Sequence, residues 1–277
     1  IKVTTTVGMV ADTARNVGGE RVEVTSLMGA GVDPHLYKAS EGDLDRLTGA
    51  DVIFYNGLNL EGKMGDLFVK MAGGGKPTVA VSEGIEKSLL REPPEFQGHA
   101  DPHVWFDVSM WAQTIPPVVE ALSKLDPGSR PLYETNGKAY HEKLMELHGF
   151  CKERLGSVPK SQRVLVTAHD AFGYFGRAYD VEVVGLQGVS TVSEVSLDGV
   201  RKLVDLIVSR KLKAVFVESS VPKRSIEAVV EGCRARGHDV RIGGTLFSDA
   251  MGEPNTPQGT YPGMVRHNVE AIVTALK

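Results

Sequence analysis

A long helical pattern in the middle of the chain restricts the possible folds more than any other feature. After the turn at 126–129, apolar residues recur about every 3.6 positions as far as Leu155, and Gly156 and Pro159 end the pattern. At 1.5 Å per residue, this segment predicts a single helix of about 40 Å. A helix of that length can run the full height of a two-lobed protein, so we expect one lobe before it and one after it.

Strand and helix patterns alternate on both sides of this central helix. The runs with strand character are 2–6, 21–28, 51–56 and 77–82 before it, and 163–167, 181–187, 213–218 and 239–242 after it. The segments with helical spacing are 8–18, 40–48, 62–72 and 108–125, then 171–179, 197–210, 222–236 and 261–277. Such alternation predicts an α/β fold in which each lobe has a roughly four-stranded, mostly parallel sheet flanked by helices.

The expected domain organisation follows from the position of the long helix. We assign residues 1–125 to an N-terminal metal-binding lobe, 126–158 to the linking helix and 159–277 to a C-terminal metal-binding lobe. The connection at 84–103 has no regular pattern, and a loop of that length inside a compact domain is usually functional or mobile.

Composition excludes several classes of function. The net charge is −4 and the basic residues are scattered among acids, so we expect no nucleic-acid partner. No run of 18 apolar residues occurs, which argues against a membrane span. The chain begins at Ile1 and enters a strand at once, which we interpret as removal of a signal peptide, with simple trimming as the alternative. Cys151 and Cys233 form no metal-binding motif, so a metal site here must use nitrogen and oxygen ligands.

The tripeptide Asp-Pro-His occurs twice, at 33–35 and at 101–103. In each copy the proline stiffens the backbone before the histidine. Aromatic residues follow closely, Tyr37 in the first copy and Trp105 in the second, so both imidazoles are expected beside apolar surface. A single loop histidine is usually solvated, whereas two such tripeptides indicate a metal pocket.

Four polar side chains are expected near the carboxyl ends of strands, where open α/β sheets bind ligands. They are His35 and His103 from the N-terminal lobe, and His169 and Asp249 from the C-terminal lobe. If the lobes face each other, three imidazoles and one carboxylate meet in one cleft, and this donor set suits tetrahedral Zn²⁺. Each of the four has a simpler alternative role, such as capping a turn. Glu218 also lies at a strand end, and we interpret it as a supporting or structural residue.

The motifs around these residues resemble those of a known family. They are Asp-Pro-His-Leu-Tyr at 33–37, Asp-Pro-His-Val-Trp-Phe-Asp at 101–107, Thr-Ala-His-Asp-Ala-Phe-Gly-Tyr-Phe at 167–175 and Leu-Phe-Ser-Asp-Ala-Met-Gly at 246–252. In this order they are similar to the metal-specific receptors of bacterial ABC importers, the zinc/manganese (ZnuA-, PsaA- and TroA-like) family. The resemblance covers the whole chain, including the long helix.

The resemblance implies a fold, a site and a location. It implies two α/β lobes joined by a rigid helix, with one metal ion buried between them and held by His35, His103, His169 and Asp249. It further implies a periplasmic or surface-anchored protein that delivers the ion to a membrane permease. We therefore expect a monomer that is not an enzyme and has no small organic substrate.

The identity of the metal is the main alternative left open. Three imidazoles favour Zn²⁺. Many zinc-specific members of the family have a His-rich loop before the second histidine, whereas the segment at 89–100 contains only His99. Mn²⁺ or Fe²⁺ is therefore the alternative cargo. A zinc-dependent hydrolase is a further alternative. Catalytic zinc usually keeps one position open for water, and four protein ligands would close it.

Overall fold

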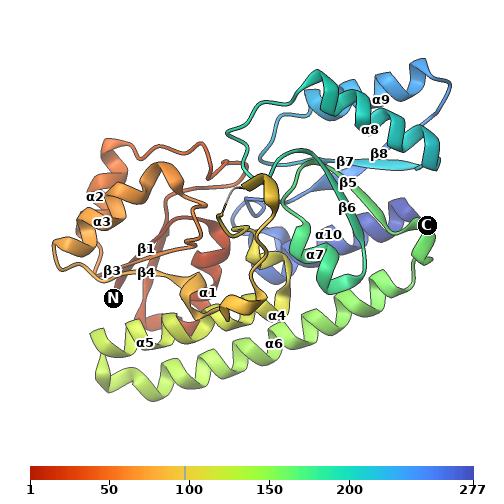
Figure 1. Cartoon of the computed structure of the whole chain (residues 1–277). Coiled ribbons are helices and arrows are strands. Elements are labelled where there is room, and N and C mark those ends of the chain that lie inside the picture. Colours follow the sequence, from red (N-terminus) through yellow and green to blue (C-terminus); the bar gives the residue numbers. More distant parts are fainter. Residues whose placement is uncertain (97) are drawn as a thin grey trace.

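The computed structural model describes residues 1–96 and 98–277, which form two lobes beside one long helix (Figure 1). The N-lobe contains a parallel sheet in the order β2-β1-β3-β4. Its strands are β1 (Lys2–Thr5), β2 (Glu23–Ser26), β3 (Val52–Tyr55) and β4 (Thr78–Ala80). The crossover helices are α1 (Gly8–Gly18), α2 (Glu41–Gly49) and α3 (Gly65–Gly73). The β-α alternation predicted for this half of the chain is confirmed.

The start of α2 fixes the loop that carries the first Asp-Pro-His tripeptide. Ser40 and Asp43 form a capping box, in which each side chain accepts a hydrogen bond from the other residue's backbone N–H. The Tyr37 hydroxyl also donates to the Asp43 carboxylate at 2.6 Å. Because Tyr37 follows His35 by two residues, the helix cap holds the chain next to that histidine.

The segment at 108–125 is not the single kinked helix that the sequence predicts. It forms α4 (Val108–Trp111), a 3₁₀ turn (Ala112–Thr114) and α5 (Ile115–Leu125). Pro116 and Pro117 have no N–H to donate to the carbonyls four residues earlier, and their rings crowd those carbonyls. The helix is therefore interrupted one turn before the prolines, and α5 starts with them in its first turn.

The long helix is α6 (Arg130–Gly156), and it passes beneath both lobes (Figure 1). It packs against α1 and α5 of the N-lobe and against α10 (Tyr261–Leu276) of the C-lobe. Its buried side chains include Tyr140, Leu147 and Cys151, which join one hydrophobic cluster that continues from the N-lobe into the C-lobe. An uninterrupted helix packed in a continuous core gives the rigid connection that was predicted.

The C-lobe has four strands in two parallel hydrogen-bonded pairs. The pairs are β5 (Val164–His169) with β6 (Glu182–Gln187), and β7 (Ala214–Glu218) with β8 (Arg241–Leu246). β5 lies next to β7, so the two pairs stand side by side in one layer (Figure 1). The flanking helices are α7 (Gly173–Tyr179), α8 (Leu197–Arg210), α9 (Arg224–Ala235) and α10. The expected α/β class is confirmed, with the C-lobe strands divided into pairs.

The last strand is longer than the sequence predicts. The sequence pattern ends this strand at residue 242, but residues 243–246 continue β8 and pair with β7 through an irregularity near Phe216. A Cβ on Gly243 would lie 2.6 Å from the Cβ of Ala275 and 3.0 Å from the Phe216 ring. Glycine is needed here because α10 and β7 approach closely, so tertiary packing overrides its low strand propensity.

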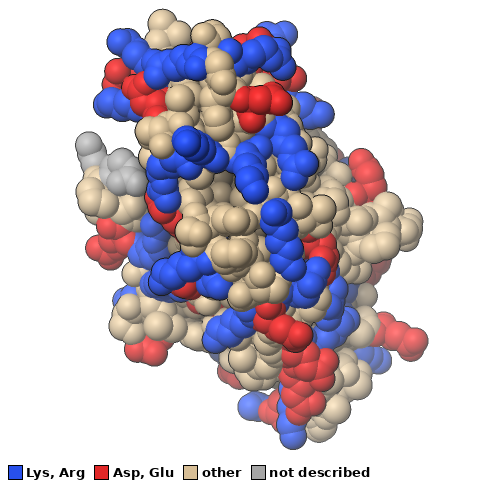
Figure 2. Space-filling model, turned by 90° about the vertical axis from the view of Figure 1, so that its right-hand side faces the viewer, with Lys and Arg blue, Asp and Glu red and all other residues tan. Residues whose placement is uncertain are grey.

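The surface of the C-lobe carries interspersed charges. Figure 2 shows the end of the molecule at the right of Figure 1, where Lys and Arg side chains lie among Asp and Glu side chains. Ion pairs within this lobe include Arg163 with Asp180 and Arg236 with Asp205. Among the described residues, no helix has both the length and the apolar character needed to cross a membrane. Cys151 and Cys233 are both buried and free.

Candidate metal centre

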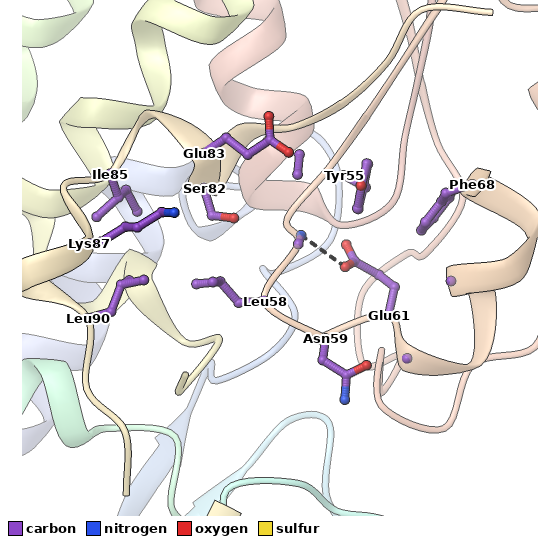
Figure 3. Close-up of a pocket in the computed structure, with 14 residues that line it drawn as sticks. Tyr55, Leu58, Asn59, Glu61, Phe68, Ser82, Glu83, Ile85, Lys87 and Leu90 are labelled. Atoms are coloured by element: carbon purple, nitrogen blue, oxygen red, sulfur yellow. Dashed lines mark hydrogen bonds between the residues drawn. The ribbon is translucent and has the colours of Figure 1, made fainter. Parts of the chain in front are cut away.

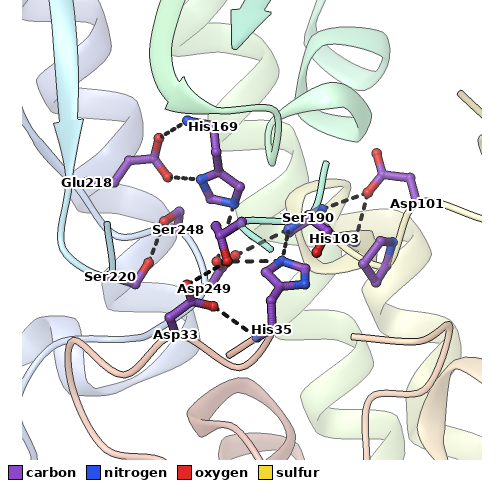
Figure 4. Close-up of polar contacts among 12 residues, drawn as sticks. Asp33, His35, Asp101, His103, His169, Ser190, Glu218, Ser220, Ser248 and Asp249 are labelled. Atoms are coloured by element: carbon purple, nitrogen blue, oxygen red, sulfur yellow. Dashed lines mark hydrogen bonds and ion pairs between the residues drawn. The ribbon is translucent and has the colours of Figure 1, made fainter. Parts of the chain in front are cut away.

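The structure brings together the four side chains singled out in the sequence (Figure 4). His35 lies in the loop after β2, His103 ends the long connection after β4, His169 is the last residue of β5, and Asp249 follows β8. One nitrogen or oxygen from each lies within 4.8 Å of the others, and all four residues are buried. Two of these residues come from each lobe, so the site exists only where the lobes meet.

Each Asp-Pro-His tripeptide is a turn that aims its histidine. Oδ1 of Asp33 accepts the backbone N–H of His35 at 2.9 Å, and Oδ1 of Asp101 accepts that of His103 at 3.0 Å. An aspartate that captures the N–H two residues ahead forms an Asx-turn, and the intervening proline fixes the backbone within it. The motif therefore presents a histidine in a set direction at the end of a loop.

The spacing of the donor atoms fits a tetrahedral metal ion. Nε2 of His35 and Nε2 of His103 are 3.2 Å apart. Oδ1 of Asp249 lies 3.3 Å from Nε2 of His103. Oδ2 of Asp249 lies 3.2 Å from Nε2 of His169 and 3.8 Å from Nε2 of His35. Metal–ligand bonds of about 2.0–2.1 Å in a tetrahedron put neighbouring donors about 3.3 Å apart. Three of these four distances match the edges of such a site, and the distance from Asp249 to His35 is about half an ångström longer.

Several of these polar atoms have no other role in the described part of the chain. Both carboxylate oxygens of Asp249 and Nε2 of His169 are buried and make no hydrogen bond of good geometry with a described residue. Buried polar atoms without partners are costly and call for an explanation such as a ligand. A cation at the centre of the four donors would satisfy all of them.

Carboxylates lie behind two of the three imidazoles. Nδ1 of His103 is 2.7 Å from Oδ1 of Asp101, and Nδ1 of His169 is 2.5 Å from Oε2 of Glu218. Oε1 of Glu218 also accepts the backbone N–H of His169 at 2.9 Å. A carboxylate on Nδ1 fixes the ring so that Nε2 faces the metal, and it makes that nitrogen more basic. Glu218 is therefore a supporting residue, as the sequence indicated.

The acids and imidazoles shift one another's pKa values. Burial lowers the pKa of His35 to about 3, so that ring is neutral at pH 7. Burial also opposes charging of His103, but Asp101 and Asp249 outweigh it and raise the pKa of His103 to about 9. His169 is equally buried, yet Glu218 and Asp249 raise its pKa well above the usual range. Without a bound cation, two imidazolium rings therefore face Asp249. Burial alone would raise the pKa of Asp249, but His169 and His103 outweigh it and hold this pKa well below its usual range.

Further contacts between the lobes surround the site. Trp105 follows His103 by two residues, and its indole Nε1 donates to the carbonyl of Ser248, next to Asp249. On the other side, the Thr191 hydroxyl donates to Oδ2 of Asp33 at 2.6 Å. The two Asp-Pro-His segments are thus each attached to the opposite lobe.

Sequence reasoning missed the support behind the second tripeptide. The side chain of Asn56 donates to the carbonyl of Pro102 at 3.0 Å. Asn56 is held by the buried carboxylate of Glu61, which accepts the N–H groups of Asn56 and Gly57 and the Thr6 hydroxyl. This turn forms one wall of an N-lobe pocket of about 600 Å³ (Figure 3). In the sequence, only the position of Asn56 directly after a strand indicated this role.

Comparison with known proteins identifies the family. The model of the zinc-uptake complex component A, periplasmic (ZnuA), matches residues 3–275. The chain belongs to the ZnuA family. The resemblance noted in the sequence motifs is thereby confirmed.

Relatives within the ZnuA family are named for two different metals. The chain is 51% identical to the zinc-binding protein TroA of Treponema pallidum over 276 residues, which cover 99% of this chain and 88% of TroA. It is 50% identical to the manganese-binding lipoprotein MntA of Bacillus subtilis over 278 residues, which cover 100% of this chain and 90% of MntA. A solved structure of periplasmic zinc-binding TroA from Treponema pallidum matches with a TM-score of 0.96 at 50% identity, covering 99% of this chain and 98% of that one.

ZnuA-family membership confirms the expected class of protein. The family comprises metal-binding solute receptors. One relative, from Streptococcus pneumoniae, is named a manganese ABC transporter substrate-binding lipoprotein. It is 30% identical over 281 residues, which cover 100% of this chain and 89% of the relative. The expected location, in the periplasm or anchored at the outer face of the cytoplasmic membrane, agrees with the description of the family as periplasmic and with relatives named as lipoproteins.

Proposed function

We propose that this chain is a Zn²⁺ receptor that captures the ion between its lobes and delivers it to the permease of an ABC importer. The observation that carries the proposal is the buried set of His35, His103, His169 and Asp249, whose donor atoms lie within 4.8 Å of one another. Three imidazoles and one carboxylate at tetrahedral spacing suit Zn²⁺ better than Mn²⁺, which prefers more oxygen ligands. Residues 1–125 and 159–277 act as the two metal-binding lobes, and 126–158 as the link.

Mn²⁺ is the second candidate cargo, and a specific observation favours it. Manganese-binding MntA is as similar to this chain as zinc-binding TroA is. Neither oxygen of Asp249 makes a hydrogen bond of good geometry with a described residue, so the carboxylate can bind an ion through both and raise the coordination number toward the value that Mn²⁺ accepts.

We further propose capture without catalysis, by a monomer. Four protein ligands leave no position on a tetrahedral ion for an activated water. The nearby carboxylates of Asp101 and Glu218 are engaged with imidazole Nδ1 atoms and are not free to act as a general base. The cargo is the ion alone, with no organic molecule or nucleic acid.

Metal analysis tests this proposal. Protein purified without added metal or chelator is assayed for bound metals, and the metal-free protein is then titrated with Zn²⁺ and Mn²⁺ in competition. We expect one ion per chain, tighter binding of Zn²⁺, and loss of tight binding in His35→Ala. A preference for Mn²⁺ would replace the cargo, whereas tight binding that persists in His35→Ala would reject the site. Hydrolytic turnover by the Zn²⁺ form would favour the enzyme alternative.

A further inference from the structure

The long connection at 84–103 is attached to the C-lobe at helix α7. The Tyr174 hydroxyl accepts the backbone N–H of Arg91 at 3.0 Å and donates to the carbonyl of Asp101 at 2.9 Å. One turn further along, Arg177 donates from Nη2 to the carbonyl of Leu89 at 2.7 Å. Two side chains of one C-lobe helix thus hold three points of an N-lobe loop.

The guanidinium of Arg91 lies at the centre of this attachment. Its Nη1 donates to Oδ2 of Asp101 at 2.7 Å, and its Cζ lies 5.7 Å from the centre of the Tyr174 ring. The Arg91 side chain is 28% exposed, whereas that of Asp101 is fully buried. A largely buried, charge-assisted hydrogen bond of this kind is stronger than one at the surface.

Gly173, the first residue of α7, provides the space for this guanidinium. A Cβ at position 173 would lie 1.2 Å from Nη1 of Arg91 and 2.2 Å from its Cζ. Any larger residue would force the Arg91 guanidinium to move from this position. The glycine in the motif at 167–175 is therefore explained by the fit of an arginine from the other lobe.

Both sides of this contact lead directly to the metal centre. Oδ1 of Asp101 accepts the backbone N–H of His103 and lies against Nδ1 of its ring, while Oδ2 receives Arg91. On the C-lobe side, α7 begins four residues after His169. A contact between Arg91 and α7 thus connects one metal-binding histidine of each lobe.

We propose that Arg91, seated at Gly173 and Tyr174, is a clasp between the lobes that holds them together around the bound cation and sets its release rate. The proposal rests on the proposed receptor function. Because the ligands are divided between the lobes, the ion leaves only when the lobes part, and parting breaks the contacts of Arg91 with α7. Arg91 does not touch the ion; it is a positioning residue that acts through Asp101 and α7.

Two substitutions test the clasp from opposite sides. Arg91→Met removes the guanidinium, and Gly173→Ala displaces it while leaving its charge in the protein. Zn²⁺ release into excess chelator is followed by stopped flow for each variant and for the double variant. We expect each single variant to release Zn²⁺ about two- to tenfold faster, the change produced by losing the contact of the guanidinium with the Tyr174 ring on α7. The double variant should release no faster than the faster single variant, because both changes remove the same contact.

Two further measurements separate the clasp from general damage. The thermal midpoint of the metal-free protein and the visible spectrum of the Co²⁺ form should stay close to wild type, since the ligands are intact. Arg91→Lys should recover part of the slow release, because an ammonium group next to Asp101 can still face the Tyr174 ring of α7. Lys87→Met, in the same loop but exposed and outside the clasp, is the matched control and should release Zn²⁺ at the wild-type rate.

The results distinguish failure of the clasp from failure of the receptor function. Wild-type release rates in both Arg91→Met and Gly173→Ala would overturn the clasp, as would fully additive effects in the double variant. Slower release from Arg91→Met would also overturn it, because the guanidinium would then act by repelling the cation. If Gly173→Ala does not fold, Arg91→Met and Arg91→Lys decide the matter alone. The receptor function fails separately, through tight binding that persists in His35→Ala.

Discussion

Oε2 of Glu218 lies 2.5 Å from Nδ1 of His169, and Oε1 of the same carboxylate accepts the backbone N–H of His169. One side chain at the end of β7 therefore fixes both the ring and the main chain of a ligand at the end of β5. Asp101 does the same for His103 with a single oxygen, which leaves its other oxygen for Arg91. The two lobes thus orient a histidine by the same chemistry built from different local structures.

Removal of the charge on Glu218 should weaken metal binding while leaving the ligands in place. Loss of a carboxylate behind a metal-binding imidazole typically costs about 10–100-fold in affinity, and we expect Glu218→Gln to fall in this range for Zn²⁺. Competition with a chelator of known affinity measures the change. Glu227→Gln, an exposed change on α9, serves as the control. An unaltered affinity in Glu218→Gln would show that this carboxylate does not support the site.

Zn²⁺ binding should release about two protons per ion at pH 7. The pKa of His103 is raised to about 9 and that of His169 is raised well above normal, so both rings are protonated in the metal-free protein. Both must lose a proton to bind the ion, so the affinity should rise with pH through the neutral range, by about 100-fold per pH unit for two protons. It should level off only above about pH 9. His35, with a pKa lowered to about 3, should not contribute near neutrality.

Calorimetry in buffers with different ionisation enthalpies counts the protons released. A count near zero at pH 7, or an affinity that does not change between pH 6 and 8, would contradict the protonation state proposed for the metal-free site.

Metal binding should stabilise the fold, and His103 should be required for that gain. By mass action, free Zn²⁺ at about 1,000 times Kd adds about 4 kcal/mol to the free energy of unfolding. His103→Ala should lose most of this gain, as measured by thermal or denaturant unfolding with and without Zn²⁺. His99→Ala, an exposed histidine in the same loop, should keep it. Equal gains in wild type and His103→Ala would remove His103 from the ligand set.

Replacing His169 with a carboxylate should shift the metal preference toward Mn²⁺. His169→Glu exchanges a nitrogen donor for oxygen and adds negative charge, which favours the harder ion. Because Glu218 lies against position 169, the variant should also carry Glu218→Gln to avoid two facing carboxylates. Competitive titration with both ions at neutral pH, with Glu218→Gln alone as the reference, gives the Zn²⁺/Mn²⁺ affinity ratio. A ratio equal to that of the reference would show that residue 169 does not set the preference.

The overall dimensions should change little when the ion binds. Helix α6 is continuous from Arg130 to Gly156, and the hydrophobic cluster it joins extends into both lobes. Small tilts of the lobes and local loop shifts are therefore expected in place of a wide hinge closure. Small-angle scattering of the metal-free and Zn²⁺ forms should give nearly equal radii of gyration, and a large compaction would contradict the rigid connection.

Much of the fold could be predicted because local periodicity carries it. The spacing of apolar residues indicated α6 and the alternating elements around it, since burial of one face imposes that spacing. The positions of His35, His103, His169 and Asp249 near predicted strand ends were enough to suggest one shared cleft. The Asp-Pro-His turns are local as well, because the aspartate bonds a backbone group only two residues away.

Other features depended on contacts between residues far apart in the sequence. β8 extends through Gly243 because α10 and β7 pack against it, and local propensity contains no information about that approach. The fit of Arg91 against Gly173 joins two lobes through residues that are 82 positions apart in the sequence, and no spacing rule identifies it. By itself, the sequence determined the elements, the turns and the donor types, because these follow from neighbouring residues. Only the tertiary structure decided which carboxylate supports which histidine and how the lobes are tied, because those choices depend on chain segments that become neighbours only on folding.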